Sequence, residues 1–175
     1  MSRPTTTPRP VAANGTYTDN GTPRNATSLT PFVVVRDAGR AIAFYEQVLG
    51  ARLIDRTDMP GADGRTLVAH AVLDFGQGLL QLGDAIPAYH LVPPPEGDDV
   101  CVSLGYYCPD TDAVVEQAVA AGAVVREPAT TFVSGDRFAS IRDPFGIRWS
   151  IMTRVEDLSP EESSRRVAEW AKSLQ

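Results

Sequence analysis

The sequence predicts an α+β protein built from two copies of one βαβββ unit. In each half an apolar strand leads into a helix that ends at a glycine, and three further strands follow. The two helix ends, Gly50–Ala51 and Gly122–Ala123, occupy matching points about 72 residues apart. A unit of this size cannot bury the face of its own sheet alone. The internal repeat therefore predicts a paired fold.

The first copy is expected over residues 29–84. Phe32–Val35 is a β-branched, apolar strand, and Asp37 is the expected N-cap of a helix with apolar residues at helical spacing up to Leu49. Gly50 supplies the left-handed residue that stops this helix. The remaining strands of the first copy are expected at residues 51–54, 65–73 and 78–82.

The second copy is expected over residues 100–156, after a proline-rich linker at residues 85–99. A strand at 100–107 leads into a helix that begins at Asp110 or Thr111 and ends at Gly122. The remaining strands are expected at residues 123–125, 137–141 and 147–152.

The turn Asp143–Gly146 introduces the last of these strands. After it, Ile147, Trp149 and Ile151 alternate with Arg148, Ser150 and Met152. This period of two predicts a strand with two chemically different faces.

The two ends of the chain differ from its middle. Residues 1–28 are rich in Thr, Pro, Asn and Arg, which predicts a mobile tail. Residues 157–175 are expected to form a C-terminal helix, because Ser159–Glu162 is a capping box. The apolar stripe of this helix is expected to pack on the domain itself or on a second subunit. Its members are Val167, Trp170, Ala171 and Leu174.

Charge and composition exclude several classes of partner. The formal net charge of −6 argues against binding to nucleic acid or to an anionic membrane. The N-terminus lacks the apolar segment of a signal peptide, so we expect a cytoplasmic protein. The cysteines, Cys101 and Cys108, fit that expectation. They would lie about 23 Å apart on one strand, too far for a disulfide, and both are expected to be buried.

Short motifs in a fixed order resemble a known family. The duplicated unit resembles the vicinal-oxygen-chelate superfamily of glyoxalases, bleomycin-resistance proteins and dioxygenases, and so do the motifs Arg40–Tyr45, Val48–Gly50 and Asp143–Gly146. Resemblance to its PhnB-like branch rests on Ala69–Ala71, Gly83–Asp84, Arg148–Trp149 and Val155–Glu162. The resemblance covers about residues 29–165. It implies that the two modules form a curled, cup-shaped mixed sheet around a small ligand, and that the protein is a homodimer.

The resemblance also implies where a metal would bind. In metal-using members four strands each supply one ligand, and the matching positions here are Pro31, Gln81, Ser103 (or its neighbour Val102) and Ser150. Proline has no donor atom in its side chain, and serine is a poor ligand for transition metals. A single neutral amide cannot hold such a metal against water. We therefore expect no metal ligands and no other cofactor.

Five polar side chains remain as candidates for the site. His70 is either an acid/base in the cup or a buried histidine bonded to a backbone carbonyl. Gln81, Ser103 and Ser150 are expected to orient a ligand, the alternative being strand polarity satisfied by water. Arg148 has the same parity as Ser150 and either holds an anionic group or lies at the sheet rim.

Aromatic residues on the same strands are candidates for the walls of the cup. Tyr106 and Phe138 are expected to contact a planar ligand, although an aromatic side chain in a strand is more often part of the core. Trp149 alternates away from Ser150, so we expect it to pack under a helix.

Two functions remain open on this basis. The first is a metal-independent protein of the glyoxalase/bleomycin-resistance type that binds a small molecule, such as an antibiotic or another aromatic metabolite. The alternative is a lyase, isomerase or dioxygenase-like enzyme that acts on a small metabolite in the cup, with His70 as acid/base or an atypical metal site. The fold hosts both classes and does not choose between them.

Overall fold

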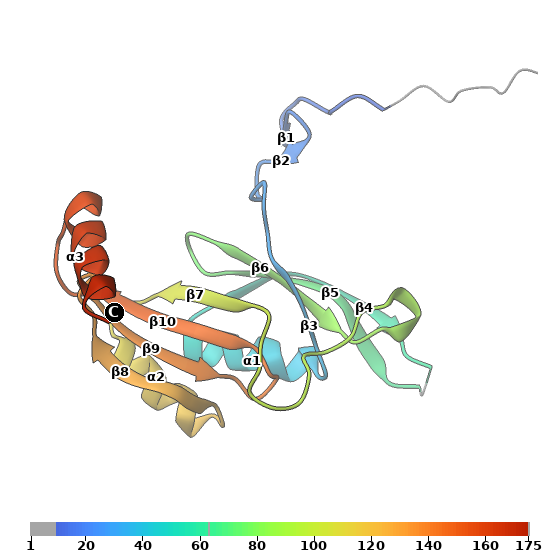
Figure 1. The fold of residues 1–175 in the computed structure, drawn as a ribbon. Helices are drawn as coiled ribbons and strands as arrows, with labels where there is room; N and C mark the ends of the chain where they lie inside the picture. Colours follow the sequence, from blue (N-terminus) through green and yellow to red (C-terminus); the bar gives the residue numbers. More distant parts are fainter. Residues whose placement is uncertain (1–9, 63, 175) are drawn as a thin grey trace, which may run out of the picture.

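The computed structural model describes residues 10–62 and 64–174 of the chain. Of the tail predicted at residues 1–28, residues 1–9 lie outside the described residues. The rest of the tail contains a short hairpin, in which β1 (Thr18–Asp19) pairs with β2 (Thr22–Pro23). This hairpin stands away from both large sheets (Figure 1).

The first module is a βαβββ unit, as predicted. Its sheet has the order β3-β6-β5-β4, with β3 and β6 parallel and the other neighbours antiparallel. Helix α1 packs against this sheet. The elements are β3 (Phe32–Val35), α1 (Ala38–Leu49), β4 (Arg52–Pro60), β5 (Thr66–Asp74) and β6 (Leu79–Asp84).

The second module repeats the same topology after a linker that contains the 3-10 helix η1 (Pro87–Tyr89). Its sheet has the order β7-β10-β9-β8, again with one parallel pair, between β7 and β10. The predicted α+β fold with a duplicated unit is therefore confirmed. The elements are β7 (Ser103–Tyr107), α2 (Thr111–Ala120), β8 (Val124–Thr131), β9 (Asp136–Arg142) and β10 (Arg148–Arg154).

Local sequence signals begin and end the two helices as expected. The Asp37 side chain accepts a hydrogen bond from the Arg40 backbone N–H, and Gly50 follows α1 at φ 65°. The Asp110 side chain likewise accepts from Ala113 at the start of α2, and Gly122 follows that helix at φ 97°. Both glycines adopt the left-handed conformation that ends a helix.

Strands β4 and β8 are longer than the sequence predicts. Each is the outermost strand of its sheet and is largely exposed, so it lacks the alternation of buried and polar residues that marks a strand. Register shifts interrupt both strands, between Thr57 and Asp58 for example. Conversely, β7 begins only at Ser103, and Cys101 before it is exposed rather than buried as expected; Cys108 is buried and both thiols are free.

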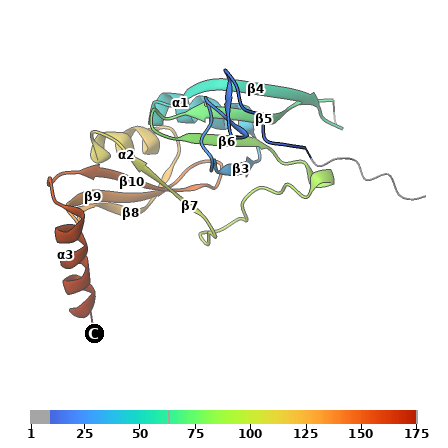
Figure 2. The ribbon, with the colours of Figure 1, turned by 90° about the horizontal axis from the view of Figure 1, so that it is seen from above.

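The two sheets are separate within one chain. Among the described residues no ladder joins β3 to β7, the edge strands of the two sheets. The modules meet instead through the helices, which contact each other, and through one hydrophobic core (Figures 1 and 2). In that core the Tyr45 ring of α1 lies 5.3 Å from Trp149 of β10, centroid to centroid.

A buried carboxylate at the turn before β10 completes this junction. Asp143 accepts hydrogen bonds from the Tyr45 hydroxyl at 2.7 Å and the Trp149 indole N–H at 3.0 Å. It also accepts from the backbone N–H groups of Phe145 and Ile147 at 2.9 and 2.8 Å. Burial raises the pKa of the Asp143 carboxyl, whereas these four donors act in the opposite direction. The turn is thereby tied to α1 of the other module.

The C-terminal helix α3 (Pro160–Lys172) is present and is capped by Ser159, as predicted. The ring of Trp170 meets Phe132 edge-on at 4.8 Å, and the Ser163 hydroxyl donates to the Ser134 carbonyl. The helix therefore rests on the loop between β8 and β9, with no fully buried side chain of its own. No helix among the described residues is long and apolar enough to cross a membrane.

Replacing Asp143 with asparagine should destabilise the fold strongly. The new amide nitrogen would face N–H or O–H donors, and one of these would lose its acceptor inside the core. We expect a loss of about 2–4 kcal/mol in the free energy of unfolding, measured by urea denaturation. The exposed control Asp157→Asn should change it by less than about 0.5 kcal/mol. Equal losses in the two variants would contradict the role given to Asp143.

Candidate functional site

Each sheet has one face covered by its helix and one face that the helix does not cover, here called the open face. On β3 and β6, Val33, Val35, Leu80 and Leu82 are buried on the helix side. Side chains alternate along a strand, so Phe32 and Gln81, which are paired in register, lie on the open face. The corresponding face of the second sheet carries Ser103 and Ser150.

The open face of the first sheet centres on an aromatic pair. The rings of Phe32 and His70 are stacked, with centroids 6.1 Å apart and planes at 22°. Gly83 makes room for this arrangement, because a Cβ there would lie 3.2 Å from the Phe32 ring and 2.8 Å from the Ala69 carbonyl oxygen. The pair offers a flat surface on which a planar ligand can stack.

His70 has a carboxylate on one side. Its Nδ1 lies 3.8 Å from Oδ2 of Asp55, across the β4–β5 ladder. That distance permits electrostatic attraction but exceeds a hydrogen bond. The imidazole is about one-third exposed. Of the two predicted alternatives, the contacts match a histidine on the open face rather than one bonded to a backbone carbonyl.

The register shows which residue of β3 lies beside Gln81. Pro31 precedes β3, and its carbonyl accepts from the Gln81 backbone N–H at 2.9 Å. The residue that lies opposite Gln81 on the open face is Phe32. A phenylalanine, like a proline, has no atom that binds a metal.

The open face of the second sheet is polar. The hydroxyls of Ser103 and Ser150 are 3.3 Å apart, so these two predicted residues do meet. The Arg148 guanidinium donates to the Ser140 hydroxyl at 2.6 Å and to the Glu127 carboxylate at 3.0 Å. Arg148 is thus held flat against the sheet by side chains of β8 and β9, rather than free at the rim.

Phe138 and Tyr106 lie on opposite faces of the second sheet. Phe138 is paired with Met152 and lies two residues from Ser140, which places it on the open face. Tyr106 lies three residues from Ser103 and therefore points to the opposite face, where its hydroxyl donates to the Leu49 carbonyl at 2.7 Å. Burial raises the pKa of this phenol. The tyrosine on the open face is its neighbour Tyr107.

A cavity of about 580 Å³ lies beside β7, at the seam between the modules. It brings together Pro31, Ser103 and Tyr106 of the predicted set with Phe75 and Trp149. Phe75 meets the Tyr106 ring at 5.8 Å and the Trp149 ring at 6.0 Å. His70, Phe138 and Arg148 are not part of this cavity. In one chain the predicted residues therefore lie in three places: on the open face of the first sheet, on the open face of the second sheet, and at the seam between the modules.

The sequence does not identify three of the site residues. It predicts that Phe32 belongs to a buried strand, whereas the pairing of Phe32 with Gln81 places its side chain on the open face. Ser140 and Glu127 hold Arg148, but they lie on strands whose register the sequence does not show. No group of three or more His, Cys, Asp or Glu side chains that could hold a metal ion occurs among the described residues.

A family model matches residues 27–151 of this chain, which span both modules. It describes the glyoxalase/bleomycin resistance protein/dioxygenase superfamily. The chain belongs to this superfamily. An uncharacterized protein of Mycobacterium bovis is 31% identical over 138 residues, which cover 77% of this chain and 88% of that protein. The predicted family is therefore confirmed.

Solved structures of other proteins share the fold. A Pseudomonas aeruginosa protein, PA1353, aligns with a TM-score of 0.60 at 22% identity, over 74% of this chain and 98% of its own. A PhnB protein from Bacillus cereus aligns with a TM-score of 0.56 at 19% identity, over 73% and 99%. At such identities the likeness concerns the fold, so function has to be argued from the open faces.

Proposed function

We propose that this superfamily member binds a small aromatic or antibiotic-like molecule without a metal, in a cup made by two chains. This proposal rests on the side chains that lie next to Gln81 and Ser150. Phe32 lies beside Gln81, and Ser103 lies beside Ser150. These side chains suit an organic ligand and not a transition metal.

The backbone of the edge strands supports a dimer. The carbonyls of Pro31 and Val35 accept bonds from the β6 side, so the backbone groups of Phe32 and Val34 point to the unpaired edge. On β7, Cys108 bonds to Met152, so the alternating groups of Gly105 and Tyr107 point outward. An unpaired strand edge is a template for pairing with another chain.

Apolar side chains gather beside one of these edges. A groove of about 540 Å³ is lined by β3, the proline-rich linker and the residues before β7. Its lining includes four side chains that are at least 37% exposed in the single chain. They are Phe32, Val92, Val100 and Val102. Exposed apolar surface beside an open edge fits contact with a second copy.

Pairing β3 of one chain with β7 of another would join the two kinds of open face. The Phe32–His70 stack and Gln81 would then stand beside the serines and Arg148 of the partner subunit. A planar ligand with an anionic group suits this combination, because the aromatic pair offers stacking and the guanidinium offers charge-assisted hydrogen bonds.

Metal independence can be tested with the purified protein. We expect well below one equivalent of transition metal per chain by elemental analysis, and no rise in Tm when Zn²⁺ or Ni²⁺ is added, because a metal stabilises only a fold that binds it. In the two-chain cup, the variant Phe32→His/Ser103→His/Ser150→Glu would bring three metal ligands together with Gln81, and it should gain a metal-dependent rise in Tm. One tightly bound metal in the unmodified protein would refute the proposal.

The dimer can be tested by placing charge in the apolar groove. Val92→Asp/Val102→Asp should shift the protein from dimer to monomer in sedimentation equilibrium, since two carboxylates per chain would be buried unpaired. Both side chains are more than half exposed in the single chain, so its fold should survive. Val119→Asp, on the exposed side of α2, is the control and should leave the dimer intact. A monomeric unmodified protein would contradict the cup.

A second function is favoured by one observation. His70 lies beside the Asp55 carboxylate, and its Nε2 has no hydrogen-bond partner among the described residues. A partly exposed histidine near a carboxylate, with a ring nitrogen that can reach a ligand, is equipped for general acid–base catalysis. The corresponding activity would be proton transfer at a carbon next to a carbonyl, as in an isomerase or lyase.

The enzymatic alternative predicts a sharp effect of His70. Deuterium incorporation from solvent into hydroxyacetone, followed by NMR, should fall by about 100-fold or more in His70→Ala. Asp55→Asn should lower the rate less than His70→Ala does. Unchanged exchange in His70→Ala, with an intact fold by circular dichroism, would exclude His70 as the acid/base.

A further inference from the structure

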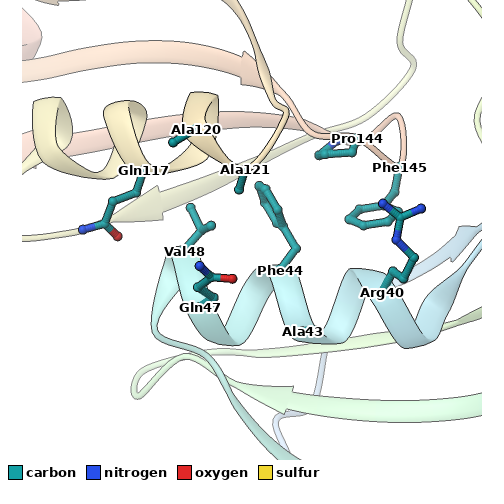
Figure 3. Close-up of a pocket in the computed structure, with 10 residues that line it drawn as sticks. All are labelled: Arg40, Ala43, Phe44, Gln47, Val48, Gln117, Ala120, Ala121, Pro144 and Phe145. Carbon is teal, nitrogen blue, oxygen red and sulfur yellow. The ribbon is translucent and has the colours of Figure 1, made fainter.

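The outer groove between the two helices has the features of a second ligand site. Helix α1 contributes a stripe at helical spacing, Arg40, Ala43, Phe44, Gln47 and Val48. Helix α2 contributes Gln117 and Ala120, and its C-cap residue Ala121 follows them. The turn Pro144–Phe145 closes one end (Figure 3). The groove has a volume of about 650 Å³, within the range of small-molecule sites.

The floor of this groove is apolar and rigid. Phe44 and Phe145 meet edge to face at 5.9 Å, and both are buried, as is Val48. The turn that carries Phe145 is fixed to α1 by the hydrogen bond from Tyr45 to Asp143. Contacts within the chain therefore fix the floor of the groove and the turn at its end. Alanines on the facing walls leave the space unfilled.

Polar groups stand at the two ends of the floor. Figure 3 shows the Arg40 guanidinium beside Phe145, and the amides of Gln47 and Gln117 at the opposite end. Within the described part of the chain, none of these three side chains has a hydrogen-bond or ion-pair partner. Arg40 and Gln47 are seven residues apart on one helix, which separates their Cα atoms by about 10 Å.

We propose that this groove binds a small aromatic carboxylate. The carboxylate would accept hydrogen bonds from Arg40, the ring would lie on Phe44 and Phe145, and a polar group at the far end would meet the two glutamines. A free guanidinium next to aromatic surface favours a planar anion over a neutral or cationic molecule. This site is separate from the cup and does not depend on the dimer.

The full-length protein can be tested with 6-hydroxy-2-naphthoate, whose carboxylate and hydroxyl lie at opposite ends of a flat ring system. Titration of ¹⁵N-labelled protein should shift the backbone signals of α1, α2 and the turn, and the side-chain amide signals of Gln47 and Gln117. Arg40→Ala should weaken binding about tenfold, the loss expected for one charge-assisted contact. The neutral 6-hydroxy-2-naphthamide should bind both proteins equally.

Two further variants keep the test decisive. Arg52→Ala removes another exposed arginine, on β4, and should leave the affinity unchanged. Ala120→Trp fills the exposed wall of the groove and should abolish the shifts on α1 and α2. Shifts confined to β3, β6, β7 and β10 would place the ligand in the cup and overturn the proposal. Equal affinity of Arg40→Ala and the unmodified protein would also overturn it.

Discussion

The Asp143 carboxylate is the interaction on which the arrangement of the two modules depends. Its four donors come from α1, from β10 and from its own turn, so one buried group fixes three pieces of the chain. A buried carboxylate is stable only when such partners surround it. Because Tyr45 and Asp143 belong to different modules, separating helix α1 from the turn would break this buried hydrogen bond. The modules of one chain meet through α1, the turn and the shared core, and among the described residues no ladder joins β3 to β7.

This junction determines what each surface can do. With the edges apart, aromatic and imidazole groups remain on one open face, and hydroxyl and guanidinium groups remain on the other. A ligand that needs both kinds of group requires a second chain, whereas the groove between the helices is complete in one chain. The hydrogen bond from Tyr45 also fixes the turn that carries Phe145, which forms part of the floor of the groove.

Local patterns in the sequence predict the elements and much of the second open face. Alternation after Asp143 places Trp149 in the core and Ser150 outside, since a strand has a period of two. The same rule argues against grouping Tyr106 with Ser103, because residues three apart in a strand point to opposite faces. The sequence underestimates the length of the edge strands β4 and β8, because exposed strands lack an apolar alternation. The sequence does not show that β3 and β7 remain unpaired, since local patterns do not reveal how two sheets far apart in the chain are placed.

The two modules share one backbone geometry but carry different side chains at matching positions. In the first module the Asp84 carboxylate accepts from the first N–H of α1, at Ala38; in the second the Thr153 hydroxyl accepts from the first N–H of α2, at Thr111. Three residues earlier on the same strands stand Gln81 and Ser150, so these are matching positions on the open faces. A pair of neutral side chains there cannot compensate the charge of a divalent metal, but both can donate to and accept from an organic ligand. In the proposed cup, recognition would depend on stacking against Phe32 and His70 and on the orientation of Arg148, which hydrogen bonds to Ser140 and Glu127 hold in place.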